Sequence, residues 1–301
     1  MKLTILGCYS ATPRIIAHTT SQVLETRGHH FLIDCGEGTQ IELRRHKLKF
    51  NQIKHIFISH LHGDHYFGLI GLISTFRLLK REVDLNIYGP KGLKEIITLQ
   101  LKLSNSWTNF NLIFHELDAK DSQCIFEDDK VEVHTIPLDH KVYTNGFLFK
   151  EKLFDRKLLI DNAEAKNIDV AYYRKLKQGA DVYNKDGVLI KNTEVTTDGR
   201  IPKRYAFCSD TAYSEAIIPI IQGVDVMYHE STFLEDQAAL CAKTKHSTAK
   251  QAAAIANKAR VGRLILGHYS SRYKDLEPFK NEAMTVFKQV ALAKDGKIFH
   301  I

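Results

Sequence analysis

The sequence lacks the features of a membrane protein and of a disulfide-stabilised one. Its five cysteines are scattered and odd in number, and none forms a Cys-x-x-Cys pair, which argues against a disulfide framework and against a thiolate zinc site. No run of about 18 apolar residues occurs, and the N-terminal segment has too short an apolar stretch for a signal peptide. We therefore expect a cytoplasmic protein that folds around a hydrophobic core and has no membrane partner.

Acidic residues are outnumbered by basic ones. The 301 residues include 42 Lys and Arg against 35 Asp and Glu, which gives a net charge of +7. An excess of positive charge favours a polyanionic partner, because Lys and Arg neutralise phosphate groups. The charge is compatible with nucleic-acid binding without demonstrating it, since many basic proteins bind no nucleic acid.

Two kinds of segment alternate along most of the chain. Short runs rich in Ile, Val, Leu and Phe predict strands, and segments with helical spacing predict helices between them, the last near 276–290. The stretch 150–204 is polar and rich in turn signals, so we interpret it as an insertion into a single domain that spans residues 1–301. Strands in both halves with helices between them predict a layered α/β sandwich, in which loops at one edge of two sheets meet.

The strongest local signal is the motif that follows an apolar strand ending at Ser59. Four potential metal ligands occur there within six positions: His60, His62, Asp64 and His65. Imidazole nitrogens and carboxylate oxygens are the ligands that zinc accepts where cysteine is absent. His60 and His62 can reach one metal ion. Asp64 and His65, on the turn, can reach another. A solvated histidine-rich turn is the alternative, but a tight loop after a buried strand favours metal ligands.

Such a site needs partners from distant parts of the chain, and three later strands are followed by suitable residues: His140, Asp210 and His268. Each lies just past an apolar strand, where the loops at one sheet edge converge. A single His or Asp in this position is more often a cap or a surface group. Together with the first motif, however, they supply five His and two Asp, enough for two metal sites with one carboxylate left to bridge them.

These motifs resemble the metallo-β-lactamase superfamily, and within it the ribonuclease Z branch, the endonucleases that remove 3′ trailers from precursor tRNA. The His-Leu-His-Gly-Asp-His sequence at 60–65 matches the first motif of the superfamily. Two further segments are similar to ribonuclease Z in particular: His-Glu-Ser-Thr-Phe at 229–233 and His-Ser-Thr at 246–248. An early turn around Asp34 resembles the one that supports the metal loop in this family. The resemblance covers nearly the whole chain and implies a four-layer αββα sandwich.

The resemblance also implies the chemistry. It assigns two zinc ions to each subunit with this ligand set: His60, His62 and His140 for one, Asp64, His65 and His268 for the other, and Asp210 between them. A hydroxide shared by the two ions is the expected nucleophile, because metal binding lowers the pKa of water by many units. Asp64 would orient this water or accept its proton, and Glu230 and His246 would assist the departing 3′-oxygen. Family members are generally homodimers, so we expect a homodimer.

Two segments depart from the family pattern. The stretch 11–18 keeps Pro13 but lacks the Lys and the Arg-Asn pair of the family, which bears on trailer specificity. The insertion at 150–204 occupies the place of the flexible arm, the tRNA exosite, although the usual Gly-Pro element is missing. Within it, Arg174, Lys175 and Lys177 beside two tyrosines suit phosphate contact with some stacking. A solvated amphipathic helix is the alternative for this cluster.

Two other functions stay open on the sequence. A small-molecule phosphodiesterase or related ester hydrolase of the same superfamily would use the same metals without needing the insertion. An RNA-binding protein with structural metals is less consistent with the residues, because structural zinc sites are usually four-coordinate and closed. The sequence leaves open the choice among zinc, manganese, iron and cobalt. It also leaves open whether precursors with an encoded CCA end are cut.

Overall fold

The computed structural model describes residues 1–12, 14, 15 and 17–301, so Pro13, in the segment that departs from the family pattern, lies outside the described residues. The described chain forms two compact units. The sandwich unit contains residues 1–127, 132–150 and 203–301, and the insertion unit contains residues 128–131 and 151–202. None of the described helices is long and apolar enough to cross a membrane.

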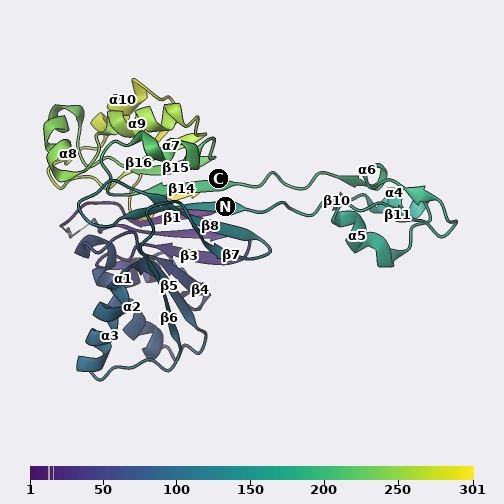
Figure 1. The fold of residues 1–301 in the computed structure, drawn as a ribbon, viewed down its shortest axis with the longest axis horizontal. Coiled ribbons are helices and arrows are strands. Elements are labelled where there is room, and N and C mark those ends of the chain that lie inside the picture. The colour runs from purple at the N-terminus through teal and green to yellow at the C-terminus, as the bar shows by residue number, and fades with distance from the viewer. Residues whose placement is uncertain (13, 16) are drawn as a thin grey trace. The chain divides into compact units, whose positions relative to one another are not determined.

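Two seven-stranded sheets make up the sandwich unit (Figure 1). The first has the order β18-β1-β2-β3-β4-β5-β6, and its strands are β1 (Lys2–Gly7), β2 (Ser21–Thr26), β3 (His29–Ile33), β4 (Ile53–Phe57), β5 (Leu85–Pro90), β6 (Leu112–Leu117) and β18 (Ile298–His300). The second has the order β17-β16-β15-β14-β9-β8-β7, and its strands are β7 (Cys124–Glu127), β8 (Val131–Pro137), β9 (Asn145–Glu151), β14 (Arg204–Cys208), β15 (Val226–Glu230), β16 (Arg263–Gly267) and β17 (Val290–Leu292). Strands β3 to β6 and β14 to β17 run parallel, so their carboxyl ends lie along one edge of each sheet.

Helices flank both sheets (Figure 1). Beside the first sheet are α1 (Thr39–Arg45), α2 (Gly63–Leu78) and α3 (Leu93–Leu103). The short helix η1 (Phe50–Gln52) directly precedes β4 in the chain. Beside the second are α7 (Ile218–Ile221), α8 (Ala238–Thr244), α9 (Ala249–Lys258) and α10 (Glu277–Met284). The short helices η3 (Glu215–Ile217) and η4 (Glu235–Gln237) directly precede α7 and α8 in the chain. This arrangement is the four-layer αββα sandwich that the sequence predicted, and the predicted fold class is confirmed.

Aromatic rings fill the space between the two sheets. Phe57 of the first sheet packs against Phe147 and Phe149 of the second, with 5.4 Å between ring centres in both pairs. Phe31 lies 5.4 Å from Phe149, and all four side chains are fully buried. Burying one such side chain stabilises a fold by about 1.5–3 kcal/mol. The sheets are therefore held firmly against each other beneath the loops at their edges.

Two helices differ from the sequence-based expectation. Helix α2 begins at Gly63, before the start near Gly68 that its apolar spacing predicted, so Asp64 and His65 lie on its first turn. A carboxylate is favourable there, because the helix N-terminus carries a partial positive charge. The last predicted helix, near 276–290, was too long: α10 ends at Met284, and the chain then forms the edge strand β17.

The insertion unit has a small core of its own. Its elements are β10 (Lys157–Leu158), α4 (Ile160–Ala165), η2 (Val170–Tyr172), α5 (Tyr173–Lys177), β11 (Val182–Tyr183), β12 (Leu189–Ile190), α6 (Asn192–Val195) and β13 (Thr196–Thr197). The pairs β10–β13 and β11–β12 form two small sheets. The buried side chains are Ala163, Ile168, Leu176, Val182, Ile190 and Val195. The main segment of this unit, 151–202, falls within the polar stretch 150–204.

Candidate metal centre

The expected ligands lie past the carboxyl ends of the strands. Three of them follow β4, β14 and β16: His60, Asp210 and His268. The loop between β8 and β9 carries His140. At this edge the two sheets are joined directly, because the Asn145 N–H donates to the Ser59 carbonyl at 3.1 Å. Side chains that are far apart in the sequence thus reach one place.

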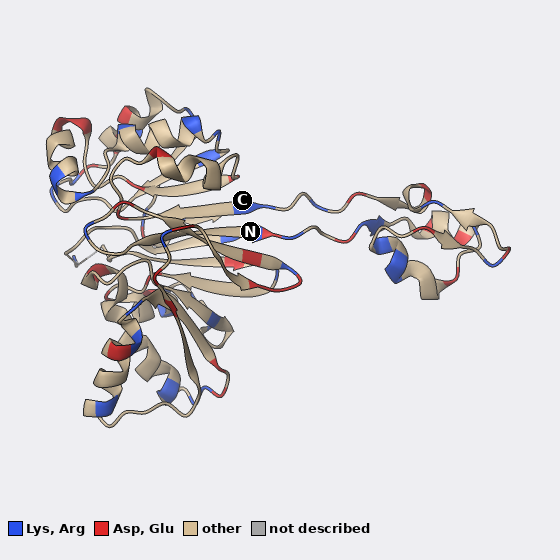
Figure 2. Cartoon of the chain, viewed as in Figure 1, with Lys and Arg blue, Asp and Glu red and all other residues tan. Residues whose placement is uncertain are grey.

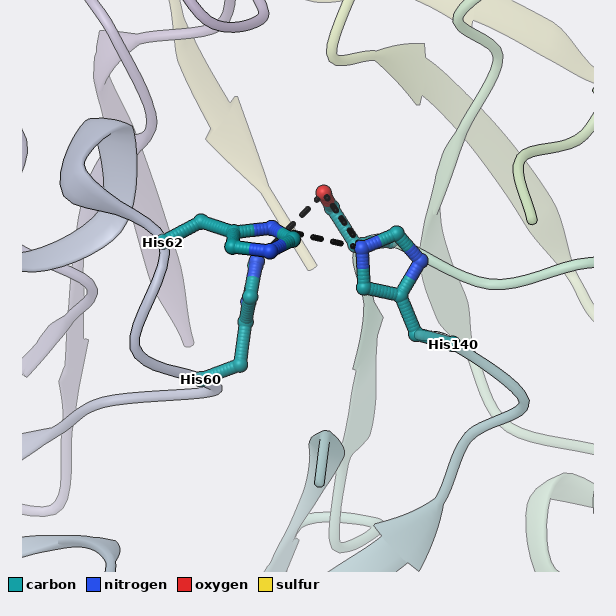
Figure 3. A group of neighbouring side chains, drawn as sticks. His60, His62 and His140 are labelled. Carbon is teal, nitrogen blue, oxygen red and sulfur yellow. Dashed lines mark hydrogen bonds and ion pairs between the residues drawn. The ribbon is translucent and has the colours of Figure 1, made fainter. Parts of the chain in front are cut away.

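One cluster consists of three imidazoles and a carboxylate: His60, His62, His140 and Asp210. Each offers one ligand atom, and these atoms all lie within 4.8 Å of one another. The three rings converge (Figure 3), with 3.3 Å between His140 Nε2 and His62 Nδ1. His60 Nε2 is buried and has no hydrogen-bond partner among the described residues. Because an unpaired buried nitrogen is costly, this donor set fits a divalent cation such as zinc.

A second cluster contains Asp64, His65 and His268. His65 Nε2 is 3.3 Å from His268 Nε2 and 3.5 Å from Asp64 Oδ2. Asp210 connects the two clusters, because its Oδ1 is 3.0 Å from His268 Nε2 and its Oδ2 is 3.5 Å from His60 Nε2. One carboxylate therefore lies between two sets of ligand atoms, as a bridging ligand of a two-metal site must.

Buried hydrogen bonds to Asp34 fix the orientation of His65. Asp34 Oδ2 accepts from His65 Nδ1 at 2.7 Å and from the Ser59 hydroxyl at 2.9 Å, and its Oδ1 accepts from the Ser59 N–H at 2.7 Å. Because Nδ1 of His65 donates to Asp34, its Nε2 faces the second cluster and is the ring atom left for a cation. Asp34, Asp210 and His268 have φ values between 55° and 58°. This left-handed conformation costs energy for residues with a side chain, and such residues gather at functional sites.

Two other candidate ligands are oriented by neighbouring loops. His140 Nδ1 donates to the carbonyl oxygen of Lys245 at 2.8 Å, and the Lys245 ammonium pairs with Asp139 at 2.9 Å. His268 Nδ1 lies 3.0 Å from the Thr232 hydroxyl. Lys245 was missed by the sequence reasoning, because a contact made through a backbone carbonyl leaves no signature in the residue type.

Carboxylates give this region a negative field. Burial alone would lower the pKa of His65, but the carboxylates of Asp210 and Asp64 raise it well above its usual value. Burial alone would raise the pKa of Asp210, but the imidazoles of His268 and His65 hold it well below its usual value. Burial and the neighbouring His65 lower the pKa of His60, which leaves a neutral imidazole. The ionised carboxylates and the neutral His60 have the protonation states that a metal ion requires of its ligands, and the protonated His65 would release a proton when a cation binds.

A hydrogen-bonded acid pair lies next to the clusters. Glu230 is fully buried, and its Oε1 accepts from His246 Nδ1 at 2.8 Å and from the Thr211 N–H at 3.0 Å. Its Oε2 accepts from the Thr232 N–H at 3.0 Å and from the Thr232 hydroxyl at 2.7 Å. Burial would lower the pKa of His246, but the Glu230 carboxylate raises it to about 9. His246 is therefore protonated at neutral pH and can donate a proton.

A pocket of about 310 Å³ is lined by candidate metal ligands and by His246 of the Glu230–His246 pair. Its lining includes His62, Asp64, Asp210, His246 and His268. The loop after β1 also reaches the pocket, because the Ala11 N–H donates to Asp64 Oδ2 at 2.7 Å. Sequence reasoning missed this contact, since it again uses a backbone group. A substrate in the pocket meets candidate metal ligands and a proton donor together.

The basic residues expected to contact RNA lie in the insertion unit. Arg174, Lys175 and Lys177 occupy α5, a helix coloured blue for basic residues in Figure 2, and all three side chains are exposed. The Lys175 ammonium lies 5.5 Å from the centre of the Tyr172 ring, and Leu176 is buried in the core of the unit. RNA contact and a solvated amphipathic helix are both compatible with this arrangement, so the role of the cluster stays a prediction.

The fold and the ligand clusters together define a class, the metal-dependent hydrolases of metallo-β-lactamase fold. Among solved structures, the short form of human tRNase Z matches with a TM-score of 0.74 at 27% identity, over 100% of this chain and 99% of that one. The metallo-β-lactamase fold protein YhfI from Bacillus subtilis matches with a TM-score of 0.69 at 19% identity, over 99% and 98% of the two chains. The second match supports the fold alone.

Relatives in sequence narrow the class to one family. Ribonuclease Z of Parabacteroides distasonis is 44% identical over 98% of this chain and 97% of its own length. Ribonuclease Z of Cytophaga hutchinsonii is 46% identical over 100% of this chain and 96% of its own length. A family model described as Anti-Pycsar protein Apyc1 matches residues 1–160. The chain belongs to the ribonuclease Z family, and the resemblance inferred from its motifs is confirmed.

Proposed function

We propose that this endoribonuclease acts in the cytoplasm on precursor tRNA, where it removes the 3′ trailer and leaves a 3′-hydroxyl on the tRNA. Relatives named ribonuclease Z match the chain over nearly its full length, and the short human tRNase Z shares its fold. The observation that carries the proposal is the Glu230–His246 pair beside the candidate metal ligands. A departing ribose oxygen needs a proton donor close to the metals but not bound to them.

Two zinc ions are the proposed cofactors. Their proposed ligands are His60, His62 and His140 for one ion, Asp64, His65 and His268 for the other, and Asp210 for both. When bound, the ions supply hydroxide near neutral pH, because they lower the pKa of coordinated water. Asp64 is the proposed acceptor of the proton that the attacking water releases, and the Ala11 N–H holds its carboxylate in place.

His246 is the proposed general acid. Its Nδ1 is held by Glu230 at 2.8 Å, so the ring keeps one orientation at the wall of the pocket. The proton passes from His246 to the 3′-oxygen of the tRNA as the bond to phosphorus breaks. The buried Glu230 carboxylate then favours the return of the imidazole to its protonated state, because it stabilises the positive charge.

The insertion unit is the proposed second contact with tRNA. Arg174, Lys175 and Lys177 are exposed on one short helix, and cations of this kind bind phosphate groups irrespective of base sequence. Such a contact adds affinity for a large RNA without affecting a small phosphodiester.

A homodimer is the proposed assembly. Three apolar side chains on α1 and α2 are strongly exposed in the single chain: Ile41 at 55%, Phe67 at 57% and Leu78 at 74%. A subunit interface over these helices would remove this apolar surface from water, which is favourable. Sedimentation of the protein at assay concentration tests the assembly, and a species of monomer mass alone would contradict it.

The direct test is incubation with a tRNA precursor that carries a 3′ trailer. We expect one metal-dependent cut that leaves a 3′-hydroxyl, and loss of the cut in Asp64→Ala. Asp121→Ala removes an exposed carboxylate elsewhere and serves as the matched control. Absence of the cut with wild-type protein, or full activity in Asp64→Ala, would overturn the proposal.

The small-molecule phosphodiesterase is the alternative within the same superfamily. The altered segment 11–18 favours it, and the full-length match to relatives named ribonuclease Z disfavours it. Salt-sensitive binding of tRNA separates the two, because a small-substrate enzyme needs no such binding. Membership of a hydrolase family disfavours an RNA-binding protein with purely structural metals.

A further inference from the structure

Thr232 lies at the junction between the acid pair and the candidate metal ligands. It follows β15, and only 3% of its surface is exposed. Its hydroxyl oxygen has three polar neighbours: Glu230 Oε2 at 2.7 Å, His268 Nδ1 at 3.0 Å and His246 Nδ1 at 3.3 Å. Thr232 belongs to the His-Glu-Ser-Thr-Phe segment, but the sequence predicted no role for its hydroxyl.

The hydrogens available decide which of these contacts are hydrogen bonds. A threonine hydroxyl donates one hydrogen and can accept others, whereas an ionised carboxylate only accepts. The Thr232 hydrogen therefore goes to Glu230 Oε2. His246 Nδ1 has a shorter contact with Glu230 Oε1, at 2.8 Å, so its hydrogen goes to the carboxylate. The Thr232 oxygen is left to accept from His268 Nδ1.

This assignment determines which tautomer His268 adopts. With the hydrogen on Nδ1, the lone pair of its Nε2 faces the second cluster, where His65 Nε2 lies at 3.3 Å. An apolar residue in place of Thr232 would leave the buried Nδ1–H of His268 without an acceptor. The tautomer of His268 that carries its hydrogen on Nε2 would then become more populated. The same change would remove one of the four hydrogen bonds that hold the Glu230 carboxylate.

We propose that Thr232 is a positioning residue whose single hydroxyl couples the metal ligand His268 to the proton-donating pair Glu230–His246. The inference rests on the proposed function and adds to it a residue that supports both metal binding and proton donation. Serine in this position retains the coupling, because it keeps the hydroxyl. Valine, which has the shape of threonine, loses both hydrogen bonds at once.

Zinc binding by metal-free protein gives a readout that does not depend on RNA cleavage. In competition with a chelator, we expect Thr232→Val to bind one of two zinc equivalents about 10- to 100-fold more weakly than wild type, and Thr232→Ser to stay within about threefold. Thr4→Val is the matched control, because the buried Thr4 hydroxyl has no hydrogen-bond partner in the described part of the chain. Thr232→Ala is a second apolar variant in case the valine variant does not fold.

The effect of Thr232 on the proton-donating pair Glu230–His246 is tested by measuring kcat at saturating zinc with two substrates. Bis(p-nitrophenyl) phosphate releases a phenolate that leaves without a proton, whereas the ribose oxygen of a tRNA precursor needs one. We expect Thr232→Val to lower kcat at least about tenfold on the precursor and by less than about threefold on the p-nitrophenyl ester. A merely structural defect lowers both rates equally.

Three results would overturn the inference: unchanged zinc affinity in Thr232→Val, equal losses on the two substrates, or a Thr232→Ser variant as impaired as valine. If wild-type protein cuts no precursor, the proposed function fails. The zinc titration still decides whether Thr232 holds His268.

Discussion

Replacement of Asp34 by asparagine tests how the candidate ligands are held. The carboxylate is fully buried and accepts from the Ser59 N–H, the Ser59 hydroxyl and His65 Nδ1. Asparagine has the same shape, but one of its two accepting oxygens becomes an NH2 donor. With its remaining oxygen on the Ser59 N–H, the amide presents a donor to the His65 Nδ1–H. The tautomer of His65 that leaves Nε2 unprotonated then loses its support.

The size of the effect follows from these contacts. Losing the partner of a metal-ligating histidine lowers metal affinity by about 10- to 100-fold, which corresponds to about 1.4 to 2.8 kcal/mol. Folding also suffers, because each buried donor left without an acceptor costs about 1–3 kcal/mol. We therefore expect Asp34→Asn to lower the free energy of unfolding of the metal-free protein by about 2 to 4 kcal/mol. The weakened zinc equivalent should be the one bound by the cluster that contains His65.

Two measurements check this prediction. Chelator competition reports the affinity of each zinc equivalent, and urea unfolding followed by circular dichroism reports stability. Asp121→Asn, at an exposed position, is the control for a lost carboxylate. A folded Asp34→Asn protein with wild-type affinity for both equivalents would refute the reasoning, because the tautomer of His65 would then not depend on Asp34.

Three further predictions concern other parts of the chain. In metal-free protein, the raised pKa of His246, about 9 against a usual 6.5, means that its pairing with Glu230 stabilises the fold fully below pH 6.5 and progressively less as the pH rises through 9. The difference in unfolding free energy between wild type and His246→Gln should shrink over that interval, and a constant difference would contradict the pairing. Lys245→Pro should weaken zinc binding about 10- to 100-fold, because proline cannot adopt the φ of 61° found at this position. The Lys245 carbonyl, which accepts the hydrogen bond from His140, would then be displaced. Lys245→Gly can adopt this φ and should bind zinc like wild type. Arg174→Glu with Lys177→Glu should weaken tRNA binding several-fold and flatten its salt dependence without slowing hydrolysis of a p-nitrophenyl ester, and unchanged salt dependence would favour the solvated helix.

Local pattern was sufficient for the fold class and for naming the candidate ligands. Apolar runs predicted the strands, and the residues that follow β4, β14 and β16 were recognisable because His and Asp have few reasons to occur together after buried strands. The element boundaries were less secure. Apolar spacing placed the start of α2 near Gly68, although Gly63 begins it, because the polar first turn carries candidate ligands instead of core residues. The edge strand β17 was not predicted, because apolar spacing extended the last helix to about residue 290 and a strand of three residues is formed mainly by its pairing with β16.

The sequence alone supplies the chemical inventory: seven candidate His and Asp ligands, a candidate acid pair in recognisable motifs, and a sandwich fold that brings strand ends to one edge. The hydrogen bonds that hold these side chains, in contrast, depend on the tertiary structure. Ala11 contributes an N–H to Asp64, Lys245 a carbonyl to His140, and Thr232 a hydroxyl that lies 2.7 Å from Glu230 Oε2 and 3.0 Å from His268 Nδ1. Every residue type has a backbone N–H and a carbonyl, and threonine hydroxyls occur throughout the chain. Their roles therefore arise only where folding brings them within about 3 Å of a partner.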